Sequence, residues 1–137
     1  MKNKLYIFVL FMPALAFCQH TNSLTVSFSG LQGKQGKVYV ALYDSEESFL
    51  NKEFKTSIVS IEDGKAKAFF EGIPNGFYAV SSFYDKNGNG KLDTNFMGIP
   101  KEPYQFSNNS KGTFGPPKFE QAKFNITTDQ IVYLNFN

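Results

Sequence analysis

The chain has 137 residues, with 14 basic residues against 12 acidic ones, a single histidine, a single cysteine and a formal net charge of +2. All the basic residues are lysines, so the chain lacks the arginine forks and the basic surplus that nucleic-acid-binding proteins use. Nucleic acid is therefore not expected as a partner, and the length suits one domain with a single core.

The N-terminus has the pattern of a secretory signal peptide. Lys2 and Lys4 precede an apolar run over 5–17, which ends in small residues. A charged start, a short apolar segment and small residues before the cut are typical of such signals. The run is too short for a comfortable membrane span, and no later segment is as apolar. We therefore predict a signal peptide at 1–18 and an exported protein of the periplasm or the extracellular space.

Two cleavage sites fit this signal. Cleavage after Cys18 leaves Gln19 as the first residue of a soluble product without cysteine, in which neither disulfides nor thiol chemistry play a part. Cleavage ahead of Cys18 would instead give a lipoprotein anchored through this cysteine, because 15–18 partly resembles a lipobox. Phe17 is bulky where that signal requires a small residue, which favours the soluble product.

After the signal, apolar and polar residues alternate in short segments separated by turn residues. In 37–43, for example, Val38, Val40 and Leu42 share one face, which is the period of a half-buried strand. The seven expected strands are 24–28, 37–43, 57–61, 65–71, 77–84, 121–127 and 131–136. They predict an all-β protein, an antiparallel seven-stranded β-sandwich of the immunoglobulin or transthyretin kind, formed by a single domain over 19–137.

The connections between these strands carry further predictions. The dipeptide Asp63-Gly64 predicts a hairpin between the third and fourth strands, and the last two strands are expected to pair with each other. Residues 45–54 break the alternation and can hold one helical turn over an end of the core. The run 77–84 carries bulk on both faces, which predicts a central strand that leads into Asp85. Residues 94–118, rich in Pro, Gly, Asn and Ser, predict one long ordered loop.

The segment after the central strand holds the most specific pattern in the chain. Oxygen-bearing side chains recur at every second position over much of 85–95, a spacing that turns several oxygens inward around a hard cation such as Ca²⁺. Compared with the calcium loop of EF-hand proteins, the matching positions are the first, third, fifth, seventh and ninth. They are occupied by Asp85, Asn87, Asn89, the backbone carbonyl of Lys91, and Asp93.

The match to a calcium loop is partial. Phe96 stands where a bidentate Glu closes the EF-hand loop, and the flanks read as strand and loop rather than as helices. The missing oxygen must come from elsewhere, and the candidates are Asn95, Glu102 and Glu120. The predicted ligand set is Asp85, Asn87, Asn89, Lys91, Asp93 and Glu102, with a weak Kd of about 10⁻⁴–10⁻³ M. The alternative is a metal-free turn, because Asn-Gly pairs favour tight turns and Asp85 can cap its own backbone.

Three stretches of the chain resemble a known bacterial family. They are Gly72-Ile73-Pro74-Asn75-Gly76-Phe77-Tyr78-Ala79-Val80, the segment from Asp85 to Asn109, and Gly115-Pro116-Pro117-Lys118-Phe119-Glu120-Gln121-Ala122. Together they resemble the exported family catalogued as domain of unknown function 2141, over nearly all of the mature chain.

This resemblance implies a small exported β-domain and brings no activity with it. Members commonly carry a His just before the first Asp, where this chain has Tyr84, so a site that used that histidine is lost here. The turn before the central strand is also similar to that of transthyretin-like and carboxypeptidase-regulatory-like sandwiches. Those domains are mostly structural or binding modules.

Enzymatic chemistry has little support in the sequence. The one histidine, His20, lies at the expected mature N-terminus, and without a further His or Cys neither a Ser-His-Asp triad nor a Cys-His pair can form. A paired-carboxylate hydrolase stays formally open; its acids would come from Asp85, Asp93, Glu102 and Glu120. We therefore expect a non-catalytic exported module with a weak structural calcium loop.

The long loop also carries aromatic residues that allow two interpretations. They are Phe96, Tyr104, Phe106, Phe114 and Phe119. In the first, the rings pin the loop onto its sheet, as in a packed Ω-loop. In the second, exposed rings over 96–119 bind a glycan, a peptide or an envelope protein. The absence of Trp disfavours glycan stacking, and packing is the expected role.

Overall fold

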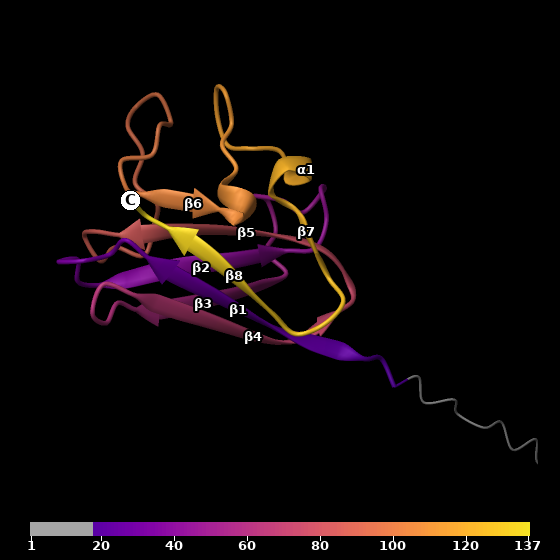
Figure 1. The fold of residues 1–137 in the computed structure, drawn as a ribbon. Coiled ribbons are helices and arrows are strands. Elements are labelled where there is room, and N and C mark those ends of the chain that lie inside the picture. The colour runs from indigo at the N-terminus through magenta and orange to yellow at the C-terminus, as the bar shows by residue number, and fades with distance from the viewer. Residues whose placement is uncertain (1–17) are drawn as a thin grey trace, which may run out of the picture.

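The computed structural model describes residues 18–137, which form two β-sheets packed against each other (Figure 1). The predicted signal peptide lies outside the described residues, apart from Cys18, which is exposed and free. No helix in the described part of the chain is long and apolar enough to cross a membrane. The elements are β1 (Thr21–Ser29), β2 (Lys37–Tyr43), β3 (Lys55–Ser60), β4 (Ala66–Pro74), β5 (Gly76–Asp85), β6 (Tyr104–Phe106), the 3₁₀ turn η1 (Ser107–Asn109), α1 (Phe119–Ala122), β7 (Phe124–Ile126) and β8 (Gln130–Asn135).

The strands form the β-sandwich that the alternation predicts. One sheet has the order β4-β1-β8, and the other has the order β3-β2-β5-β6, with β7 beside the start of β5. The described residues hold eight strands rather than the seven expected, because Tyr104–Phe106 pair with β5 inside the predicted long loop. The sandwich is also not wholly antiparallel, since β8 runs parallel to β1.

Two predicted hairpins have the expected turns but the wrong partners. At Asp63-Gly64 both residues have positive φ (49° and 73°), and Glu62 bridges Lys65 as in a tight turn. The flanking strands β3 and β4 nevertheless enter different sheets. Likewise β7 pairs with β5 and β8 with β1, so the turn between them carries the chain from one sheet to the other. Alternation specifies which face of a strand is buried, but it does not specify the neighbouring strand.

The core lies between the inner faces of the two sheets. Alternate residues of β1, of β2 and of β4 as far as Phe70 are buried there, because successive side chains of a strand point to opposite faces. The buried cluster is Leu24, Val26, Phe28, Leu31, Val38, Val40, Leu42, Ala66, Ala68, Phe70, Ile73, Tyr78, Val80, Tyr84, Ile126, Leu134 and Phe136. The strand β5 is central as predicted, with hydrogen-bonded neighbours on both sides.

The outer face of β5 is partly covered by a second, smaller cluster. Phe49, from the segment between β2 and β3, has ring-centroid distances of 5.3 Å to Tyr43, 6.2 Å to Phe106 and 5.8 Å to Phe119. The backbone N–H of Phe49 donates to the carbonyl of Ser45, which is the helical turn expected there. The residues before and after η1 are therefore anchored on the sheet rather than free.

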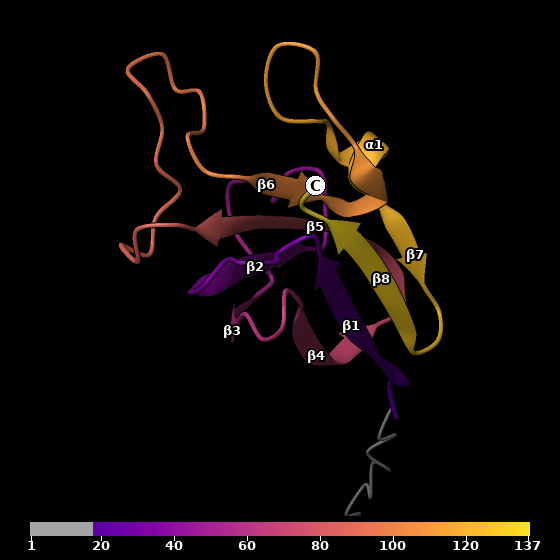
Figure 2. The ribbon, with the colours of Figure 1, turned by 60° about the vertical axis from the view of Figure 1, so that its left-hand side comes forward.

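Ser107 joins this covering layer to the sheet. Its side chain is completely buried, and its Oγ accepts a hydrogen bond from the N–H of Val80 at 2.9 Å. The same hydroxyl donates to the carbonyl of Ala122 at 2.5 Å. Two loops leave from this fixed base, the first loop at 86–103 and the second loop at 110–118. Figure 2 shows both of them projecting from the same side of the molecule.

Candidate functional site

The candidate site begins where β5 ends. Asp85 is the last residue of this strand, opposite Lys37 of β2, and its side chain is only 3% exposed. Its Oδ1 accepts the N–H of Gly88 at 2.9 Å, and its Oδ2 accepts the N–H of Gly90 at 2.8 Å. Gly88 and Gly90 have φ of +73° and +75°, a conformation that residues other than glycine rarely adopt. The Asp85 carboxylate therefore folds the start of the first loop around itself.

The electrostatics of Asp85 favour the ionised form. Burial raises the pKa of the carboxyl, but the backbone N–H groups of Gly90, Gly88, Asn89 and Asn87 together lower the pKa below its ordinary value. Hydrogen bonds donated to a carboxylate stabilise its charged form. The loop thus holds a negative charge at its base at neutral pH.

The side-chain amides of the loop gather around Asp93. The side-chain amides of Asn87 and Asn89 donate to the two oxygens of the Asp93 carboxylate, the second at 2.8 Å to Oδ1. The amide oxygens of the same two residues accept backbone N–H groups, from Asn89 at 3.2 Å and from Lys91 at 3.0 Å. The loop therefore brings these four predicted residues together, with the Lys91 side chain exposed.

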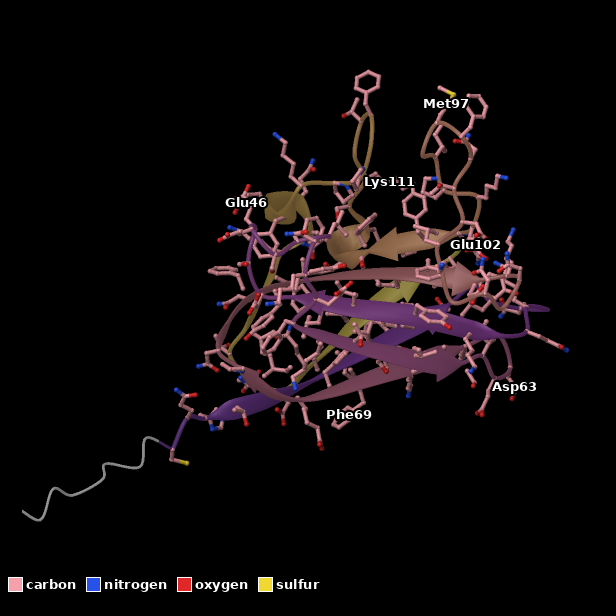
Figure 3. All side chains as sticks on the ribbon, turned by 180° about the vertical axis from the view of Figure 1, so that it is seen from behind. Glu46, Asp63, Phe69, Met97, Glu102 and Lys111 are labelled. Atoms are coloured by element: carbon pink, nitrogen blue, oxygen red, sulfur yellow. The ribbon has the colours of Figure 1, made fainter. Side chains whose placement is uncertain are left out.

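Glu102 closes the loop from outside the motif. Its Oε1 accepts the N–H of Lys86 at 2.8 Å, and its Oε2 accepts the N–H of Asp93 at 3.1 Å. The side chain is only 5% exposed, although its neighbour in sequence, Lys101, is on the surface. The backbone N–H of Lys101 donates to the carbonyl of Asp93 at 2.7 Å, which aligns the two arms of the loop. Figure 3 shows Glu102 at the base of the first loop.

The remaining two candidates for the missing ligand have other roles. Asn95 Oδ1 accepts the N–H groups of Met97 at 2.9 Å and Ile99 at 3.0 Å, so this side chain caps the tip of the loop. Glu120 lies on α1 and forms an ion pair with Lys123 at 2.7 Å. Within residues 18–137, no group of three or more His, Cys, Asp or Glu side chains is arranged to hold a metal ion. Any cation in this loop would thus need amide and carbonyl oxygens in addition to carboxylates.

A family model with the description "uncharacterized protein conserved in bacteria" (DUF2141) matches residues 26–133. The match runs from within β1 to within β8 and includes the whole first loop. This chain belongs to the DUF2141 family. The resemblance that the motif residues indicate is thereby confirmed. No curated protein and no solved structure matches the chain.

The aromatic residues of this DUF2141 domain fall into two groups. Phe106 and Phe119 are buried, at 7% and 6% exposure, as the packing interpretation predicts. Phe96 in the first loop and Phe114 in the second loop are fully exposed, at 97% and 103%. Tyr104 is intermediate, since 45% of it is exposed beside Phe106. Packing therefore explains only part of the long loop.

The DUF2141 site also uses a stacked pair that the sequence interpretation missed. Tyr39 and Phe83 are direct cross-strand neighbours, with ring centroids 5.0 Å apart and planes within 9° of parallel. A Cβ added at Gly90 would lie 3.2 Å from the hydroxyl oxygen of Tyr39, so the loop sits closely over this pair. Both rings occupy outward positions of predicted strands. The signal that could have found them is the register of those two strands.

Proposed function

We propose that this DUF2141 protein is a non-catalytic module, exported to the bacterial envelope or the exterior, whose loop over 85–102 binds Ca²⁺ weakly and is stiffened by it. One observation carries this proposal. The Glu102 carboxylate comes from a later segment and lies against both ends of the motif, which supports a role as the last ligand that the comparison with calcium loops lacks. A carboxylate brought back from a later segment is what a partial calcium loop requires.

The polar groups of the loop support a calcium ion more than a smaller cation. Rotation of an Asn amide by a half-turn exchanges its nitrogen for its oxygen. Such a rotation at Asn87 and Asn89 directs two oxygens toward Asp93. An amide oxygen placed next to a carboxylate is repelled by it, but a cation between the two makes the arrangement favourable. A flexible set of carboxylate, amide and carbonyl oxygens suits Ca²⁺ better than Mg²⁺.

Thermal unfolding of residues 19–137 in calcium and in chelator tests the ion. With a Kd of about 10⁻⁴–10⁻³ M, about 10 mM calcium should stabilise the fold by about 1.4–2.7 kcal/mol. Asp93→Asn should abolish the shift, whereas Asp129→Asn, which removes an exposed acid near the other end of the sandwich, should leave it unchanged. A melting temperature that calcium does not change would refute the calcium site.

Export is tested by the N-terminus of the protein recovered from its own cell. Cleavage after Cys18 gives a chain that begins at Gln19 and is released with the soluble fraction. A chain that begins with a lipid-modified Cys18 would instead make the protein a lipoprotein. Recovery of the uncleaved chain in the cytoplasm would contradict export altogether.

A second candidate function is favoured by the exposed aromatics. The two loops could form a binding site for a glycan, a peptide or an envelope protein, because a cleft of 340 Å³ opens at their bases. Tyr104, Lys111 and Phe136 are among the residues that line it. Co-sedimentation with purified peptidoglycan tests the glycan case. Retention that Tyr104→Ala abolishes would support it, and equal retention of the variant would count against it.

A further inference from the structure

The tips of the two loops expose large apolar side chains, two of them almost completely. Phe96 and Phe114 are 97% and 103% exposed, and Met97 and Ile99 are 69% and 54% exposed. We call these four residues the apolar loop tips. Large exposed apolar groups that gather on one side of a soluble domain mark a surface that is covered in use.

The tip of the first loop is a hydrogen-bonded structure. Asn95 Oδ1 accepts two N–H groups of the tip, and the backbone N–H of Asn95 donates to the carbonyl of Ile99 at 2.9 Å. Thr94 also bridges Pro100, so the tip closes as a short antiparallel turn. The exposure of Phe96 and Met97 is therefore built into the loop.

Both loops project in the same direction. They extend beyond the β6 edge of the sandwich in Figures 1 and 2, and in Figure 3 Met97 lies at the tip of one of them. Phe69, an exposed residue of β4, lies on the opposite side of the molecule in Figure 3. A flat surface laid across the two tips would touch both loops at once.

The exposed charges within 94–118 are positive, although the exposed Glu120 follows the second loop on α1 and pairs with Lys123. Over 94–118 the basic residues are Lys101, Lys111 and Lys118, all exposed, and the one acidic residue is Glu102. Glu102 is buried, and both of its oxygens accept backbone N–H groups. The two loops therefore present apolar tips together with exposed lysines nearer their bases, a combination that suits the surface of an anionic membrane.

We propose that the apolar loop tips insert into the surface of a lipid bilayer with anionic headgroups, with the three lysines against its phosphates. A protein partner would need a separate socket for each tip. The acyl region of a bilayer accepts apolar groups of any shape, and its headgroups attract lysine. The proposal does not depend on calcium, because the tips and the lysines lie outside the predicted ligand set.

Vesicle binding of residues 19–137 tests the proposal, since this segment contains every described strand and the whole core. The chain should bind vesicles of phosphatidylglycerol and phosphatidylethanolamine more tightly than phosphatidylcholine vesicles. Phe96→Ser and Phe114→Ser should each lower the partition coefficient about tenfold. Lys111→Gln should lower it about fivefold, on the anionic vesicles only.

The matched control is Phe69→Ser, which removes an exposed Phe from the opposite side of the molecule (Figure 3). It should leave vesicle binding unchanged. Wild-type protein that stays in solution with anionic vesicles at low salt would overturn the proposal. Equal losses for Phe69→Ser and Phe114→Ser would also overturn it, because binding would then be unspecific adsorption. Unchanged melting temperatures of the loop variants exclude misfolding as the cause of any loss.

A fluorescent reporter gives a second readout. The chain has no tryptophan, so Phe114→Trp and Phe69→Trp each introduce a single one. The emission of the first should shift to the blue on anionic vesicles, and that of the second should not. Sedimentation of the protein without lipid tests whether a second copy of the chain, rather than a bilayer, covers the tips. A dimer that Phe96→Ser dissociates would overturn the lipid assignment, because the tips would then cover each other.

Discussion

Removal of the buried Glu102 side chain should weaken the fold more than removal of an exposed acid. Its carboxylate holds the backbone N–H groups of Lys86 and Asp93, and these are the two ends of the predicted calcium motif. Alanine at this position leaves both N–H groups without their acceptor. The buried carboxylate makes both contacts directly, so this role does not require an ion.

The magnitude follows from these two contacts. A hydrogen bond to a charged group contributes about 1.5–3 kcal/mol. Both N–H groups are only partly buried, so water can reach them after the change and the lower end applies. Glu102→Ala should therefore lower the free energy of unfolding by about 3 kcal/mol, and Glu102→Gln, which retains one acceptor, by about half of that. For a domain of this size, the melting temperature should fall by about 10 °C in Glu102→Ala.

Urea unfolding of the wild type and the variants, in chelator, measures this effect. The matched control is Glu120→Ala, because Glu120 makes only an exposed ion pair with Lys123. An exposed pair contributes at most about 1 kcal/mol. If Glu102→Ala proved no more destabilising than Glu120→Ala, the closure of the loop by a buried carboxylate would be refuted.

Three further predictions concern the base of the site and its support. Because hydrogen bonds lower the pKa of Asp85 in the folded state, its contribution to stability is complete above the ordinary Asp pKa of about 3.9 and is lost as the pH falls through the lower folded value. The wild-type urea midpoint should therefore fall more steeply in this window than that of Asp85→Asn, and parallel curves would contradict the assignment. Ser107→Ala should lower the free energy of unfolding by about 1–3 kcal/mol, since two buried backbone groups lose their partner, and chemical denaturation measures it. Gly90→Ala should destabilise the fold more than Gly88→Ala. Both residues have positive φ, but only the Cβ added at Gly90 would contact another residue, at the Tyr39 hydroxyl. Equal melting temperatures of the two variants would contradict the close packing there.

Local patterns in the sequence predicted the strands that alternate over their whole length. In β2 the buried Val38, Val40 and Leu42 are those of the predicted face, because a period of two has only one interpretation. The strand β6 was missed because three residues are too few to show a period. The parallel partner of β8 was missed because β1 lies about a hundred residues away along the chain, and alternation carries no information about the neighbour.

The candidate site divides in the same way. Asp85, Asn87, Asn89 and Asp93 come together because one short loop carries them, so their spacing alone predicts their proximity. Among the more distant candidates, the choice of Glu102 depends on the return of the chain along β5 to form β6. For the aromatic residues of the long loop, residue type alone does not predict which are buried. Phe106 and Phe114 are the same residue type in the same predicted loop. Phe106 lies on a strand and packs against Phe49, whereas Phe114 lies exposed in the middle of the second loop.

The first loop combines a buried polar base with an exposed apolar tip, the reverse of the usual distribution in a soluble domain. The base holds Asp85 and Glu102 through backbone N–H groups, and the tip exposes Phe96 and Met97. The exposed apolar groups contribute little to the folded state, because they contact water in the folded and the unfolded chain alike. Substitutions at the base should therefore change stability, and substitutions at the tip should change only binding. Because the first loop is fixed at its base, its tip can change in sequence without loss of the core. A binding module needs this separation of stability from recognition.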